Sequence, residues 1–253
     1  MATTDRSRLR LRQGTCDDRA ASTVAAVTSP VVLVHGWGGS FATTWHNNGF
    51  TELLHDAGRD VVGVDLLGHG TAPKPHDPAS YDDLTGRVIE ALPSDAVDAI
   101  GFSLGAITLL RVAMREPQRF RRLVLAGIGK SLFDTDDTRT QRIIDALEGR
   151  GDPDDNLSRM FVQYANQPGN DIAALTAVMK RPRSPITPEM LATVSCSTLV
   201  IVGDRDFAAP GEPLADALPN ATLRTLRNVD HFATPEAFGF IDAALGFVDA
   251  VPA

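Results

Sequence analysis

The sequence has little cysteine, few aromatic residues and no long apolar run. Only Cys16 and Cys196 occur in 253 residues, and two distant cysteines form neither a disulfide framework nor the paired spacing of a zinc site. No apolar run approaches the roughly 20 residues that span a bilayer. The N-terminus lacks the apolar stretch of a secretory signal. We therefore expect a protein of the reducing cytoplasm with no membrane partner.

An excess of basic residues is also missing. Lys and Arg total 24 against 32 Asp and Glu, a net charge of −8, so the chain lacks the basic footprint of a nucleic-acid-binding protein. Hydrophobic residues make up 43% and charged residues 22%, which is typical of a packed globule. The alternating Arg and Leu of residues 8–12 predict a half-exposed edge strand.

Short β-branched runs alternate with helical stretches along the chain. We predict strands at residues 31–34, 61–65, 97–102, 123–126, 198–202 and 222–226, and helices at residues 45–57, 81–92, 104–115 and 212–217. Continuous apolar strands separated by helices indicate an α/β fold with a mostly parallel sheet covered on both faces. The loops at the carboxyl ends of the strands then share one rim of the sheet.

One stretch interrupts this rhythm. Residues 131–193 contain no convincing strand, but they contain helical patches at 139–147, 157–164 and 172–179. A stretch this long between two core strands is more than a plain connection. We expect a helical cap at 131–193, inserted between two parts of one core domain at 1–130 and 194–253. An ordinary connection with extra helices is the alternative.

A nucleophile motif follows the third predicted strand. Gly101-Phe102-Ser103-Leu104-Gly105 opens the next predicted helix. A turn this tight holds its central residue in a strained conformation, and the flanking glycines leave room for it. The Ser103 hydroxyl would then lie beside a helix N-terminus, which favours negative charge. A turn without chemistry is the alternative.

A glycine-rich loop, His35-Gly36-Trp37-Gly38-Gly39-Ser40, follows the first predicted strand. Its small residues would let the Trp37 backbone N–H join that of Leu104 as an oxyanion hole, where one donor is typically worth about 3 kcal/mol. The loop lacks the Gly-Lys-Ser/Thr ending and the Gly-x-Gly-x-x-Gly spacing of phosphate-binding loops. We expect His35 itself to be structural.

A serine nucleophile needs a base, and the base needs an acid. Of six histidines only His231 follows Ser103, and it comes just after the last predicted strand. Asp204 and Asp206 both lie in the loop after the strand at 198–202, so either could orient the imidazole. Asp230 adjoins His231 and should point elsewhere, and Asp134 is a remote further candidate. Along the chain the serine comes first, the aspartate second and the histidine third. This order differs from the order of the same three residues in the two well-known families of serine protease.

These motifs together resemble the α/β-hydrolase superfamily over about residues 30–250. The loop from His35, the segment Asp65-Leu66-Leu67-Gly68-His69-Gly70, the serine motif, Gly203–Asp206 and Asp230–Phe232 stand in that family's order. The resemblance implies a mostly parallel, eight-stranded twisted sheet with a leading hairpin in residues 1–29. It also implies a cap after the sixth strand, Asp206 as the triad acid and a structural His69. Asp230 departs from the family, where glycine more often precedes the base.

We therefore expect a serine hydrolase that cleaves a small to medium carboxylic ester or thioester through an acyl-enzyme. Ser103 would attack, His231 would act as base and then acid, and Asp206 would hold the imidazolium. Cleavage of a C–C bond or a lactone is the enzymatic alternative, although Gly105-Ala106 departs from the two glycines often found in C–C hydrolases. A non-catalytic receptor of the same fold is the other alternative. We expect no cofactor or metal, because the histidines show no His-Glu-x-x-His pattern. The apolar cap residues should pack on the core and partly roof the site: Leu132, Phe133, Met160, Phe161, Tyr164 and Met179.

Overall fold

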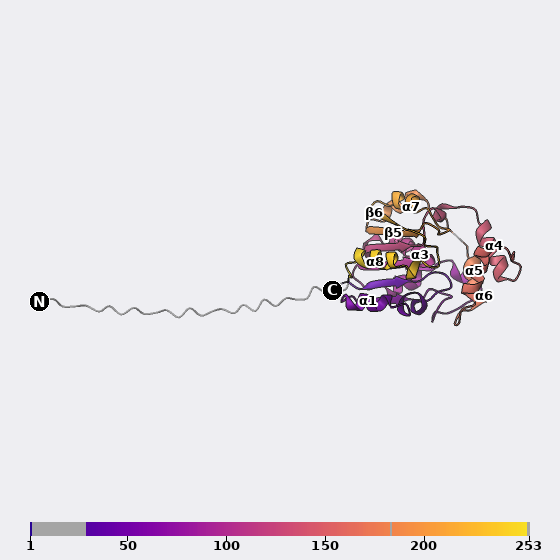
Figure 1. The fold of residues 1–253 in the computed structure, drawn as a ribbon, viewed down its shortest axis with the longest axis horizontal. Helices are drawn as coiled ribbons and strands as arrows, with labels where there is room; N and C mark the ends of the chain where they lie inside the picture. The colour runs from indigo at the N-terminus through magenta and orange to yellow at the C-terminus, as the bar shows by residue number, and fades with distance from the viewer. Residues whose placement is uncertain (2–28, 183, 252–253) are drawn as a thin grey trace.

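The computed structural model describes Met1, residues 29–182 and residues 184–251. The edge strand predicted at residues 8–12 lies outside the described residues, as does nearly all of the expected leading hairpin. Within them the chain forms one sheet flanked by helices (Figure 1). This confirms the predicted α/β class and the mostly parallel sheet.

All six strands of the described sheet run parallel, in the order β2-β1-β3-β4-β5-β6. Their bounds are β1 Val31–Val34, β2 Val61–Val64, β3 Val97–Phe102, β4 Phe120–Ala126, β5 Ser197–Gly203 and β6 Ala221–Leu226. The expectation of eight strands is therefore corrected to six in the described part of the chain. The resemblance placed the missing pair at the N-terminus, which the described residues do not cover.

Strands are added to the sheet on one side of β1 and then, from β3 on, on its other side. The chain goes from β1 outward to β2 and then returns to β3 on the other side of β1. Loops that leave the carboxyl ends of two such strands diverge and leave a crevice between them, which is where α/β proteins bind ligands. The glycine-rich loop after β1 and Ser103 after β3 both lie at this point.

Alternate strand residues form two separate cores, one on each face. Val31 and Leu33 pack with Trp45, Phe50 and Phe240, whereas Val32 and Val34 belong to the other cluster. The first face is covered by α1 (Phe50–Asp56) and α8 (Phe238–Phe247), and the second by α2 (Thr85–Ala91), α3 (Leu104–Arg115) and α7 (Glu212–Ala217). Burial on both faces explains why the strands are continuous apolar runs.

One predicted helix is divided in the structure, the helix predicted at 81–92 is shorter there (α2), and one helix was not predicted. The helix predicted at 45–57 divides into a π-helical turn, Ala42–His46, and α1, because Gly49 between them adopts a left-handed conformation with φ of 82°. Helix α8 was not predicted. Its sequence is apolar almost throughout and contains Gly239 and Gly246, so it shows no clear helical periodicity.

Between β4 and β5 the described residues form helices and connecting loops but no strand. These are α4 (Thr138–Leu147), α5 (Asn156–Ala165) and α6 (Ile172–Lys180), with short 3-10 turns at Lys130–Phe133 and Pro188–Thr193. The three helices group together at one end of the molecule, on the right in Figure 1. The division into a core at 1–130 and 194–253 and a cap at 131–193 stays a prediction, and we use "cap" below for this helical segment.

Candidate active site

Ser103 lies at a strained turn between β3 and α3. Its φ of 51° and ψ of −113° are unusual for a residue with a side chain. The turn is held because the Ser103 backbone N–H donates to the Ala126 carbonyl at 2.8 Å. A Cβ on Gly101 would stand 2.7 Å from the Ala106 nitrogen, and one on Gly105 would stand 2.3 Å from the Val34 oxygen. Both glycines are therefore required by the close approach of strand and helix.

His231 stands between Ser103 and Asp206. Its Nε2 lies 2.9 Å from the Ser103 Oγ, and its Nδ1 lies 2.9 Å from both carboxylate oxygens of Asp206. His231 and Asp206 are each only 5% exposed, so water screens their contact weakly. A proton on Nδ1 leaves Nε2 free to accept the serine proton, which is the arrangement that activates a serine nucleophile.

The other candidate acids point elsewhere. Asp204 accepts a hydrogen bond from the Asn228 backbone N–H at 2.7 Å and so closes the neighbouring turn. Asp230 accepts from the Ala233 N–H at 3.0 Å, as expected for a residue adjoining the histidine. Asp134 is exposed at the end of the 3-10 turn Lys130–Phe133. Of these four aspartates, Asp206 is therefore the one that the structure places against His231.

The glycine-rich loop after β1 passes close to Ser103. A Cβ on Gly36 would lie 2.8 Å from the Phe102 ring and 3.3 Å from the Ser103 Cβ. The next residue, Trp37, fixes the loop to α6, because its indole Nε1 donates to the Leu175 carbonyl at 3.0 Å. Leu104 opens α3, where a backbone N–H has no carbonyl one turn earlier in the helix to bond. Both predicted oxyanion residues thus adjoin the serine turn.

His35 and His69 form a buried structural pair. The His35 Nδ1 donates to the Gly36 carbonyl at 2.7 Å and its Nε2 accepts from the Leu66 N–H at 3.1 Å, which defines a neutral ring. The two imidazoles lie 5.0 Å apart. Burial lowers the pKa of His35, and burial together with the neighbouring His35 lowers the pKa of His69 to about 3. Neither ring is available as a base for Ser103.

Aromatic side chains surround the His231 ring. The Phe207 centroid lies 4.2 Å from it, Phe102 5.0 Å and Phe232 5.7 Å. Phe161 of helix α5 packs on Phe207, Phe232 and Trp37 at 5.3 to 5.9 Å. The cap thus contributes Phe161 to the aromatic cluster that surrounds the histidine. Burial also raises the pKa of the Tyr164 phenol, which belongs to the same helix.

Phe161 and Tyr164 are among the cap residues predicted from the sequence, whereas Phe207 was not predicted. The one signal in the sequence for Phe207 is its position directly after Asp206. Of the other cap residues named, Met160 is exposed, whereas Leu132, Phe133 and Met179 pack against the core cluster.

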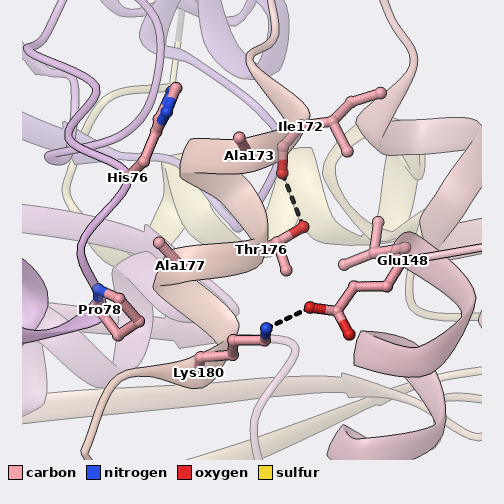
Figure 2. A pocket seen from close by; sticks show the side chains of 9 residues that line it. His76, Pro78, Glu148, Ile172, Ala173, Thr176, Ala177 and Lys180 are labelled. Carbon is pink, nitrogen blue, oxygen red and sulfur yellow. Dashed lines mark hydrogen bonds and ion pairs between the residues drawn. The ribbon is translucent and has the colours of Figure 1, made fainter.

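A surface pocket of about 500 Å³ lies apart from these residues, and Figure 2 shows it between α6, the end of α4 and the segment that contains His76 and Pro78. Its charged groups are already paired: Lys180 donates to Glu148, and His76 lies 2.9 Å from Asp171. It therefore presents no free charge to a ligand. Among the described residues no group of three or more His, Cys, Asp or Glu is placed to hold a metal ion.

A sequence model of the alpha/beta hydrolase family matches residues 31–243, and the chain belongs to that family. It is 29% identical over 249 residues to a 2-hydroxy-6-oxononadienedioate/2-hydroxy-6-oxononatrienedioate hydrolase of Cupriavidus pinatubonensis (strain JMP 134 / LMG 1197), covering 86% of this chain and 84% of the relative. It is 26% identical over 234 residues to a 2-hydroxymuconate semialdehyde hydrolase of Pseudomonas sp. (strain CF600), covering 82% of each.

A solved structure described as "Est816 as an N-Acyl homoserine lactone degrading enzyme" superposes with a TM-score of 0.66 at 22% identity, over 87% of this chain and 93% of that one. At this identity the likeness shows the fold alone. The fold and the family together define an enzyme of the α/β-hydrolase superfamily. In the described part of the chain, no helix combines the length and apolarity needed to cross a membrane.

Proposed function

We propose that Ser103, His231 and Asp206 are the catalytic triad of a hydrolase that acts on the carbonyl carbon of a small molecule. The observation that carries this proposal is the chain of 2.9 Å contacts from the serine hydroxyl through the imidazole to the buried carboxylate. Ser103 attacks the carbonyl while His231 takes its proton. The backbone N–H groups of Trp37 and Leu104 bind the oxyanion, and Asp206 stabilises the imidazolium.

We propose further that the bond cleaved is a C–C bond beside a ketone or aldehyde carbonyl. The support is the similarity to curated hydrolases of 2-hydroxy-6-oxo-dienedioates and 2-hydroxymuconate semialdehyde over more than four fifths of the chain. When the tetrahedral adduct collapses, the electron pair of the C–C bond goes to the leaving fragment. That fragment takes a proton from the His231 imidazolium. Water, deprotonated by His231, then releases the acyl group from Ser103.

Hydrolysis of a carboxylic ester is the second candidate, and the serine motif itself favours it. Gly105 is followed by Ala106 and not by a second glycine, a departure from the pattern often found in C–C hydrolases. The same triad would serve, because both reactions begin with attack on a carbonyl and pass through an acyl-enzyme.

Two experiments test these proposals. A fluorophosphonate should add one adduct to the wild-type protein by intact mass and none to Ser103→Ala, and an adduct that persists in the variant would place the nucleophile elsewhere. The second compares kcat/KM for 2-hydroxy-6-oxo-2,4-heptadienoate and for 4-nitrophenyl acetate, with products identified by mass. We expect the dienoate to be preferred at least 100-fold. A preference for the ester would instead establish the second candidate.

A further inference from the structure

An asparagine of the cap holds the glycine-rich loop that carries Trp37. Asn170 lies between α5 and α6, and its Nδ2 donates to the Gly38 carbonyl at 2.8 Å and to the Tyr164 carbonyl at 3.2 Å. Because both partners are carbonyls, the group that faces them is the NH2 end of the amide. The side chain therefore joins the end of α5 to a loop 132 residues earlier in the chain.

The Gly38 carbonyl depends on this bond. Gly38 is buried, and a buried carbonyl that receives no hydrogen bond is unfavourable. Its φ of 75° lies in a region that glycine enters without strain, so the residue restricts the loop little by itself. The cap also packs on it, since a Cβ on Gly38 would stand 2.7 Å from the Tyr164 Cδ1. Two groups of the cap thus fix this peptide group.

The orientation passes from one peptide group of the loop to the next. In a trans peptide group the C=O and the N–H point in opposite directions. The Gly38 carbonyl faces Asn170, and the N–H of the same peptide group, which belongs to Gly39, donates to the Gly36 carbonyl at 3.2 Å. The Gly36 carbonyl therefore faces into the turn, and the N–H across its own peptide group, that of Trp37, points out of it.

The Trp37 N–H is one of the two proposed oxyanion donors. In the part of the chain that the structure describes, this N–H has no backbone acceptor. The Gly36 carbonyl on the other side of the peptide group also accepts from the His35 Nδ1 at 2.7 Å. Two hydrogen bonds on that carbonyl thus set the direction of the N–H, and one of them comes from the peptide group that Asn170 fixes.

We propose that Asn170 is a positioning residue for the oxyanion hole, through which the cap sets the direction of the Trp37 N–H. It acts through the Gly38–Gly39 peptide group and not by contact with the reacting carbonyl. This inference rests on the proposed function, since it assumes that the Trp37 N–H binds the oxyanion that forms when Ser103 attacks.

The test replaces Asn170 by aspartate, which has the same shape but no N–H donor. In Asn170→Asp, kcat on the best substrate should fall at least tenfold while KM changes less than threefold, because a misdirected oxyanion donor weakens binding of the transition state and not of the substrate. Asn170→Ala removes the donor without adding a charge and should show the same effect. Asn170 is half-buried in a connecting turn, so both variants should fold, and their melting temperatures check this.

The matched control is Asn166→Asp in the same cap. The Asn166 Nδ2 donates to the Val162 carbonyl at 2.8 Å, within its own helix, and the side chain is exposed. This variant should keep both kcat and KM.

A tetrahedral analogue gives a second measurement that a loosened cap would not change. The Ser103 Oγ adds to the carbonyl of an alkyl trifluoromethyl ketone as His231 takes the proton, so this inhibitor needs the oxyanion hole, whereas the matching methyl ketone binds without it. The ratio of their two inhibition constants should fall at least tenfold in Asn170→Asp and stay unchanged in Asn166→Asp.

The outcomes separate this inference from the proposed function. If the wild-type enzyme cleaves the dienoate or the ester, and the Asn170 variants keep both kcat and the inhibitor ratio, the inference is wrong and the hydrolase remains. A loss confined to KM would also overturn it, because it would place Asn170 in substrate binding. If the wild-type protein cleaves neither substrate and takes no fluorophosphonate adduct, the proposed function is wrong and the inference falls with it.

Discussion

Asp206 and His231, 25 residues apart in the chain, meet with both carboxylate oxygens 2.9 Å from the same imidazole nitrogen. The carboxylate also accepts the Ala208 backbone N–H at 2.8 Å. This second bond holds the acid in place when the imidazole is neutral. The pair therefore fixes the tautomer of His231 before any substrate arrives.

Asp206→Asn should lower kcat by about 10⁴-fold, because an amide can hold the imidazole in the wrong tautomer and does not stabilise its charged form. Steady-state kinetics on the best substrate measure this effect. Asp204→Asn is the control two residues away, since Asp204 closes the Asn228 turn and does not contact His231. It should change kcat less than threefold. Equal losses in both variants would contradict the assignment of the acid.

Gly105→Ala should destabilise the fold by about 3 kcal/mol, because the added methyl would overlap backbone that is fixed in the sheet. The Cβ would stand 2.3 Å from the Val34 oxygen and 2.5 Å from the His35 oxygen. Gly86→Ala is the control. Gly86 is exposed in α2 with nothing near its Cβ position, so alanine should stabilise the helix by about 0.5–1 kcal/mol. Urea unfolding followed by circular dichroism distinguishes the two, and similar free energies of unfolding would refute the close approach.

Acid should destabilise the protein partly through His69. Burial lowers its pKa in the folded state to about 3 from 6.5, so the unfolded chain takes up the proton first as the pH falls. The contribution of His69 to stability is present above pH 6.5 and is lost below it, by about 1.4 kcal/mol for each pH unit down to about pH 3. Between pH 7 and pH 5 this amounts to about 2 kcal/mol.

His69→Gln removes this titrating group. Between pH 7 and pH 5 the free energy of unfolding should therefore fall less in the variant than in the wild type, and the two falls should differ by about 2 kcal/mol. His55→Gln, at an exposed position in α1, should behave like the wild type. Urea unfolding at the two pH values measures the difference. The same pH dependence in all three proteins would show that His69 is protonated as easily in the folded state as in the unfolded one.

Much of the core could be predicted from the sequence, because the local pattern of each element agrees with its position in the fold. The strands at 31–34 and 97–102 and the helices at 104–115 and 212–217 lie where the sequence predicts them. Each is an apolar run buried on two faces or a helix with a clear boundary. Strand β4 was predicted three residues short, because Arg121 and Arg122 near its start are charged and partly or fully exposed. Helix α8 was not predicted, because nearly all of its residues are apolar and the sequence therefore shows no helical periodicity.

The sequence by itself determined that a serine follows the third core strand, that one histidine comes after it, and that an aspartate stands in the loop before that histidine. Chain order can be read from the sequence directly, and it limits the base to one histidine and the acid to a few aspartates. The resemblance already implied Asp206 as the acid, but only the tertiary structure decided that its carboxylate contacts His231 while Asp204 bonds the Asn228 N–H, and that the Phe207 ring packs against His231. Those contacts depend on the direction of side chains on loops that meet only when the sheet is assembled. The periodicity or spacing of residues within one segment does not predict that direction.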